Sequence, residues 1–218
     1  MNVDKYELVI FDWDGTLMDS TAVIARSLQA ACRDVGCPVP SEEEALFVIG
    51  LNIADTFKRV VPDLDEEGRR RLADRYRHHF LAGESEAPLF GGVREMLADL
   101  HGRGRRLAVA TGKARRGLDR ALDATRLREW FEATRCADEG FAKPHPGMLL
   151  TLMDLTGVEP RNALMVGDTT HDLELAEQLL DHALFLREGR PAASIPRPGR
   201  LRAVYQEVMT SPPDGARS

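Results

Sequence analysis

Short, unbroken apolar runs recur along the chain and predict strands that are buried on both faces. Three stronger runs and two weaker ones lie at residues 8–11, 107–110, 163–166, 183–186 and 133–137. Continuous rather than alternating apolar residues are typical of central strands in a parallel sheet, which helices cover on both sides. Between the runs, apolar residues follow the 3.6-residue helical period at residues 93–100, 118–122 and 173–180. This alternation predicts an α/β core with a doubly wound, mostly parallel sheet.

Residues 18–88 interrupt the alternation, because they contain helical patterns and no strand-like run. Their apolar positions predict helices near residues 24–35, 46–49, 54–60 and 72–80. After Arg187 the strand and helix pattern fades, and prolines punctuate the chain. We therefore expect residues 1–17 and 89–210 to form the core, residues 18–88 to be an all-helical insert, and residues 211–218 to be a disordered tail.

The composition is that of a soluble globular protein, with 218 residues of which 43% are hydrophobic and 29% are charged. The formal net charge of −6 argues against a mainly electrostatic grip on nucleic acid, which needs a basic surface. No apolar run approaches the roughly 20 residues that cross a bilayer, and the first residues lack the pattern of a signal peptide. Three cysteines do not suggest a disulfide framework, so a cytoplasmic location is expected.

Two carboxylates follow the first predicted strand, in the sequence FDWDGTL at residues 11–17. A carboxylate is one of the side chains that attack phosphorus to form an acyl phosphate, and Asp12 stands at the end of the strand. Asp14 could then protonate the leaving alkoxide and later activate water. A turn or a helix cap explains a lone Asp-Gly pair, but the whole heptapeptide behind a buried strand favours the catalytic interpretation.

Two further motifs offer groups that bind phosphate oxygens. Thr111 and Gly112 end the second strand, where a hydroxyl and the N–H groups of a turn can hold phosphate. Lys143, in the sequence KPHP, can neutralise phosphoryl oxygens and the repulsion between carboxylates. Each signal is weak alone, because turns and solvated lysines are common. The basic side chains between residues 103 and 120 are expected to form a solvated face, with some of them bordering the phosphate pocket.

The fourth motif, VGDTTHD at residues 166–172, places Asp168 after a buried strand and Asp172 one helical turn later. Carboxylates at this spacing fit Mg²⁺, although each aspartate alone is also a plausible helix cap. All four motifs lie at carboxyl ends of predicted parallel strands, where open α/β sheets bind ligands. Carboxylates gathered there repel one another, so a divalent metal together with Lys143 would supply the missing positive charge.

The order of the motifs resembles the haloacid dehalogenase (HAD) superfamily and, within it, the phosphoglycolate phosphatase-like branch. The shared elements are Asp-x-Asp-Gly-Thr, Thr, Lys-Pro and Gly-Asp-x-x-x-Asp, and the resemblance extends to about Ala176. It implies a Rossmann-like core in which the helical insert is a cap that closes over the substrate. Relatives commonly have Ala-Gly at the end of the helix after the last motif, whereas this chain has QLLDH at residues 178–182.

The resemblance also implies a role for each motif residue. Asp12 would be the nucleophile and Asp14 the general acid and base. Thr111, with the Gly112 turn, would bind the phosphoryl group, and Lys143 would stabilise it. Mg²⁺ would be held by Asp12, the backbone carbonyl of Asp14, and Asp168, with Asp172 in support through water or Lys143.

The function expected from these residues is Mg²⁺-dependent hydrolysis of a small phosphorylated metabolite through an aspartyl phosphate, with phosphoglycolate as a candidate substrate. One alternative is a phosphotransferase similar to the β-phosphoglucomutases, although residues 18–21 lack the histidine expected there in that group. Another is a non-catalytic binding protein on the same fold, against which the intact catalytic positions count. Neither nucleic acid nor membrane is an expected partner, and both a monomer and a homodimer are compatible with the sequence.

Overall fold

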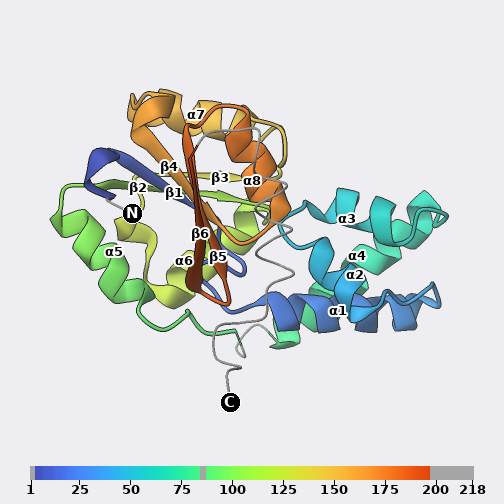
Figure 1. Ribbon diagram of the computed structural model, residues 1–218. Helices are drawn as coiled ribbons and strands as arrows, with labels where there is room; N and C mark the ends of the chain where they lie inside the picture. The colour runs from blue at the N-terminus through green and yellow to red at the C-terminus, as the bar shows by residue number, and fades with distance from the viewer. Residues whose placement is uncertain (1–2, 84–86, 197–218) are drawn as a thin grey trace, which may run out of the picture.

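The computed structural model describes residues 3–83 and 87–196, and a six-stranded sheet lies at its centre (Figure 1). The strands are β1 (Leu8–Phe11), β2 (Arg106–Thr111), β3 (Ala133–Cys136), β4 (Ala163–Gly167), β5 (His182–Arg187) and β6 (Arg190–Pro196). Their order is β3-β2-β1-β4-β5-β6, with β1 to β5 parallel and β6 antiparallel to β5. β1 is therefore central, and its Ile10 is level with Ala108 of β2 and Met165 of β4.

Helices cover both faces of the sheet, as Figure 1 shows. They are α5 (Val93–Gly102) and α6 (Arg115–Thr125) on one face, and α7 (Gly147–Thr156) and α8 (Thr170–Glu177) on the other. Successive side chains of β1 point to opposite faces, so Val9 and Phe11 pack with α5 and α6, while Leu8 and Ile10 pack with α7 and α8. Every residue of β1 is buried, which explains the unbroken apolar run in its sequence.

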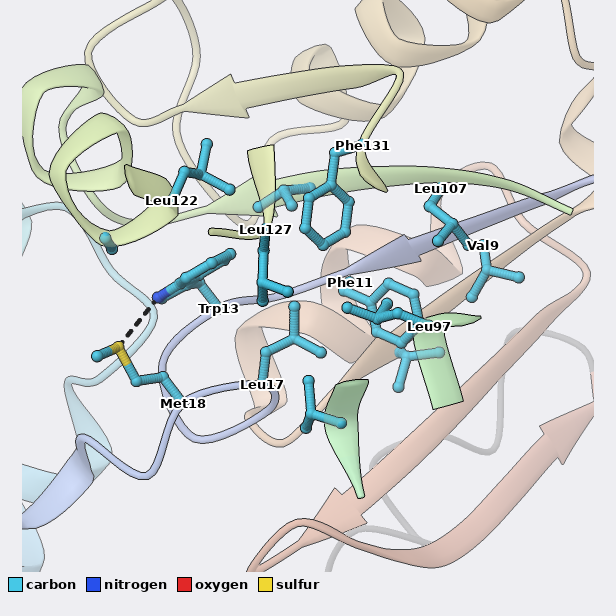
Figure 2. Close-up of a cluster of buried hydrophobic side chains, with 14 of the residues drawn as sticks. Val9, Phe11, Trp13, Leu17, Met18, Leu97, Leu107, Leu122, Leu127 and Phe131 are labelled. Atoms are coloured by element: carbon cyan, nitrogen blue, oxygen red, sulfur yellow. Dashed lines mark hydrogen bonds between the residues drawn. The ribbon is translucent and has the colours of Figure 1, made fainter. Parts of the chain in front are cut away.

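The core on the α5–α6 side also fixes the loop that follows β1. Figure 2 shows Trp13 and Leu17 among the apolar side chains of this cluster, and both are fully buried. The Trp13 Nε1–H group donates a hydrogen bond to Met18 Sδ at 3.2 Å. Because Trp13 lies between Asp12 and Asp14, its burial holds the segment that carries both carboxylates against the sheet.

The described residues between 18 and 88 form a separate group of helices, called the cap below. They are α1 (Thr21–Val35), α2 (Glu42–Phe47), α3 (Ile53–Val60) and α4 (Glu66–Gly83), and Figure 1 shows them beside one end of the sheet. The cap has its own apolar core, in which Leu28, Phe57 and Leu72 are buried. The two connections to the sheet domain lie side by side, since the Asp19 N–H donates to the Pro88 carbonyl at 2.8 Å.

The α/β class, the doubly wound sheet and all five expected strands are confirmed. Helix α7 and strand β6 were not predicted. Helix α7 is apolar on most of its surface and shows no amphipathic period, while β6 contains prolines that argued against a strand and that an edge strand can accept. Helix α8 ends at Glu177, short of the expected residue 180, and α2 begins at Glu42, earlier than expected, on a Ser41 capping box.

The expected disordered tail lies outside the described residues. Among those residues, no helix combines the length and the hydropathy needed to cross a membrane.

Candidate active site

Four loops bring polar side chains to the carboxyl edge of the sheet, at the point where its strand order reverses. The chain runs from β1 to β2 on one side and later reaches β4 on the other side of β1. Such a switch point leaves a crevice at the ends of the two central strands, which is where open α/β sheets bind ligands. Asp12 follows β1 and Asp168 follows β4, so both carboxylates stand at this crevice.

Asp12 and Asp172 share one lysine in the buried centre of the site. Lys143 Nζ lies 2.8 Å from Asp12 Oδ1 and 2.6 Å from Asp172 Oδ1, and the lysine side chain is completely buried. Although burial disfavours the charged amine, the two carboxylates hold the pKa of Lys143 above its usual value. Neither carboxylate oxygen of Asp12 has a hydrogen-bond partner in the described part of the chain. Oδ1 thus lies against the Lys143 amine as an ion pair, and Oδ2 remains available to react or to bind a cation.

Asp12, Asp168 and Asp172 carry more negative charge than Lys143 balances. An oxygen from each of the three lies within 4.8 Å of the others. Burial raises the pKa of Asp12 to about 7 against the effect of Lys143, and repulsion from Asp172 and Asp14 adds to the increase. Burial, together with repulsion from Asp12 and Asp172, also raises the pKa of Asp168 well above its usual value. Clustered carboxylate oxygens that lack counter-charge are the donor set that a hard divalent cation such as Mg²⁺ prefers, so the residues fit the expected metal.

Two glycines allow this cluster to form. A Cβ atom on Gly15 would lie 2.0 Å from Asp168 Oδ2, and a Cβ on Gly167 would lie 2.4 Å from Asp172 Cγ. Gly15 also has a φ of 81°, in the left-handed region that favours glycine. The close approach of backbone to carboxylate explains why glycine stands in each of the two acidic motifs. Thr16 completes the contact by donating a hydrogen bond to Asp168 Oδ1 at 2.6 Å.

Replacing Gly15 with alanine is expected to lower both stability and phosphatase activity. The left-handed backbone alone costs a non-glycine residue about 1–2 kcal/mol, and the new methyl group would also displace Asp168. Gly36→Ala is the matched control, because Gly36 has a similar φ of 76° with nothing within 4 Å of its Cβ position. Urea denaturation should show the larger loss for Gly15→Ala, and only that variant should lose phosphate release. Equal losses of stability with full activity in both variants would contradict this packing of the loop.

The Asp14 carboxylate lies outside the three-carboxylate cluster and has separate partners. Ser20 donates a hydrogen bond to Asp14 Oδ1 at 2.5 Å, and Lys113 Nζ lies 3.0 Å from the same oxygen. Burial raises the pKa of the Tyr76 phenol in the cap, and the nearby charge of Asp14 raises it further. The sequence pattern did not indicate Ser20 or Tyr76. It placed Lys113 on a solvated face, whereas only 9% of the Lys113 side chain is exposed.

Thr111 and Gly112 lie at the end of β2, next to β1. Thr111 is buried, and its hydroxyl accepts a hydrogen bond from the Lys113 N–H at 3.2 Å. A Cβ on Gly112 would lie 2.5 Å from the carbonyl oxygen of Gly50, so the α2–α3 loop of the cap lies directly on this turn. The expected phosphate-binding turn is therefore covered by the cap.

The cap also contacts the opposite side of the site. The Phe47 and His171 rings meet edge to face with centroids 5.9 Å apart, and the Phe47 carbonyl lies 3.3 Å from His171 Nε2. Beside this contact, a cavity of about 500 Å³ separates the start of α3 at Asn52 from the β3–α7 loop. The cavity is lined by Lys143 but not by the four site aspartates, which are Asp12, Asp14, Asp168 and Asp172. Cap and sheet domain therefore meet around the site, with open space on the Lys143 side.

Comparison with known proteins assigns this arrangement to a family. The sequence model described as haloacid dehalogenase-like hydrolase matches residues 9–179. A "probable phosphatase IndB" of Dickeya dadantii is 37% identical over 78% of this chain and 76% of its own length. A phosphoglycolate phosphatase of Aliivibrio fischeri is 32% identical over 85% and 86% of the two chains. A crystal structure described as a predicted phosphoglycolate phosphatase from Haemophilus somnus superposes with a TM-score of 0.72, at 27% identity over 80% of this chain and 82% of that one.

Proposed function

The chain belongs to the haloacid dehalogenase-like hydrolases and is a phosphatase, and from that premise we propose that it hydrolyses small phosphomonoesters through an aspartyl phosphate on Asp12. The observation that carries the proposal is the state of Asp12. Its carboxylate is buried at the crevice, with Oδ1 in an ion pair with Lys143 and neither oxygen hydrogen-bonded within the described residues. A free, desolvated carboxylate oxygen is suited to nucleophilic attack.

In the first half of the reaction, Asp12 Oδ2 attacks phosphorus while the bond from phosphorus to the ester oxygen breaks. Lys143 stabilises the negative charge near Asp12, and Asp14 donates a proton to the leaving alkoxide. In the second half, Asp14 takes a proton from water, which attacks phosphorus, and the bond to Asp12 breaks to release inorganic phosphate. Ser20 and Lys113 both contact Asp14 Oδ1 and so fix the orientation of the group that moves the proton.

Mg²⁺ is the proposed cofactor. The carboxylates of Asp12 and Asp168, with the backbone carbonyl of Asp14, would hold it, and Asp172 would support the site through Lys143. When bound, a divalent cation neutralises charge on the phosphoryl oxygens and on the clustered carboxylates. Thr111 and Gly112 are the proposed phosphate-binding groups on the β2 side.

The proposed substrate is a small phosphorylated metabolite, with phosphoglycolate as the first candidate. The name of the Aliivibrio fischeri relative supports this candidate, and the cap loop that lies on the turn at Gly112 would help to keep bulk water from the phosphate-binding side. We further propose a cytoplasmic location, which the three free cysteines support.

A phosphate-release screen over a panel of phosphomonoesters tests the proposal. With Mg²⁺ present, the protein should release phosphate from several small esters, and chelation by EDTA should remove the activity. Isomerisation of a sugar phosphate without release of phosphate would instead indicate a phosphotransferase. Tight binding of a partner without hydrolysis of any ester would indicate a non-catalytic protein.

A further inference from the structure

Lys113 lies at the junction of the cap with the acid–base side of the site. It follows β2, and its Nζ is 3.0 Å from Asp14 Oδ1. The same Nζ lies 4.7 Å from the centroid of the Phe80 ring, on helix α4 of the cap. A charged amine held between a carboxylate and an aromatic face is largely removed from water, so its charge acts strongly on any group that enters beside it.

Aromatic side chains of the cap pack in a row that reaches this amine through Phe80, and Tyr76 and Phe80 are called the aromatic wall below. The Phe80 and Tyr76 rings stack with centroids 6.0 Å apart, and Phe57 meets Tyr76 edge to face at 6.4 Å. Tyr76 and Phe80 lie one helical turn apart on α4, so both rings face the same side of the helix. The wall and Lys113 come from different domains and meet beside Asp14.

The two lysines of the site have different charge environments. Lys143 is held by two buried carboxylates, Asp12 and Asp172. In the described part of the chain, the ion pair of Lys113 is with Asp14 alone. Asp14 Oδ1 also accepts a hydrogen bond from the Ser20 hydroxyl. A second anion could therefore share Lys113 while Asp14 keeps a hydrogen-bond donor. Lys113 is therefore the lysine of the site with charge available for a ligand.

We propose that Lys113 determines substrate specificity by binding an anionic substituent, a carboxylate or a phosphate, on the leaving group of the substrate. The inference rests on the proposed function, in which Asp14 must contact the ester oxygen to protonate it. Because Lys113 Nζ lies 3.0 Å from Asp14, it reaches a group only one or two bonds beyond that oxygen. The aromatic wall of Tyr76 and Phe80 limits the leaving group to a compact one.

A matched pair of substrates measures this preference. The carboxylate of 2-phosphoglycolate and the neutral hydroxymethyl group of 2-hydroxyethyl phosphate are similar in size, and pyrophosphate supplies a phosphate leaving group. The parent should favour 2-phosphoglycolate over 2-hydroxyethyl phosphate in kcat/KM by about tenfold or more, the value of one charge-assisted hydrogen bond. Lys113→Gln should bring that ratio close to one, and Lys113→Arg should restore part of it. The rank of pyrophosphate against 2-phosphoglycolate distinguishes a phosphate-binding site from a carboxylate-binding one.

A control variant and a binding measurement separate specificity from general damage. Arg77→Gln removes an exposed positive charge from the same cap helix and should leave the substrate ratio unchanged. Calorimetric titration of the Asp12→Asn protein with each ester should show the same preference in Kd, and Asp12→Asn/Lys113→Gln should lose it. Equal loss on all substrates, or a parent ratio near one, would overturn the assignment and leave the phosphatase mechanism standing. No phosphate release from any ester would instead sink the proposed function, and the titration would still decide whether Lys113 recognises the anion.

Discussion

Asp12→Asn is expected to abolish phosphate release while leaving the metal-free protein at least as stable as the parent. The amide is a poor nucleophile and cannot form the acyl phosphate, so the rate should fall by on the order of 10⁴-fold or more. The same substitution removes a buried charge from the cluster with Asp168 and Asp172, where repulsion opposes folding unless a cation is bound. Activity and stability should therefore change in opposite directions.

Phosphate release and thermal unfolding, each measured with Mg²⁺ and with EDTA, check both parts. In EDTA the variant should melt at or above the parent temperature, and Mg²⁺ should raise the melting temperature of the parent more than that of the variant. Asp74→Asn is the control, because Asp74 is an exposed aspartate of α4 whose replacement should change neither property. Full activity of Asp12→Asn would refute the nucleophile assignment. A variant that melts well below the parent in EDTA would refute the excess of negative charge.

The strands and the acidic cluster were predictable because local sequence carries their physical cause. Strand β1 is buried on both faces, and only an unbroken apolar run satisfies that environment. The two glycines beside Asp168 and Asp172 are required by contacts within the motifs themselves or between neighbouring strand ends. A parallel sheet brings the carboxyl ends of β1 and β4 together, so motifs far apart in sequence had to meet.

The surroundings of Asp14 were not predictable, because they depend on how the cap lies on the sheet domain. Lys113 belongs to a stretch rich in arginine, which predicts a solvated side chain, but its amine lies against Asp14 and the Phe80 ring of α4 and is largely buried. Nothing in the local pattern around Tyr76 indicates that a ring that packs against the cap core also lies close to Asp14. Ser20 stands at the N-cap position of α1, but its hydroxyl makes no capping bond and donates to Asp14 instead.

Lys143→Met is expected to cause the largest loss of stability among single substitutions at the site, together with loss of activity. The change leaves Asp12 and Asp172 buried without their shared cation, and removing one partner of a buried ion pair costs about 3–5 kcal/mol. Phosphate release should fall by on the order of 10²–10³-fold or more, since a positive charge beside the transferring group is lost.

Urea denaturation in EDTA measures the stability part without interference from metal binding. Adding Asp12→Asn to Lys143→Met should recover part of the lost free energy of unfolding, because one of the two unpaired carboxylates is removed, whereas activity should stay absent.

Lys58→Met is the matched control. The Lys58 amine pairs with Asp55 on the surface, where 64% of the Lys58 side chain is exposed, so the expected change in the free energy of unfolding is within about 0.5 kcal/mol. Two results would show that Lys143 is not the cation that holds the two carboxylates together. One is a Lys143→Met protein with the same free energy of unfolding as the parent, and the other is a double variant less stable than Lys143→Met. Recovery of stability in an inactive double variant would show that Lys143 stabilises the fold by balancing the buried carboxylates that catalysis requires.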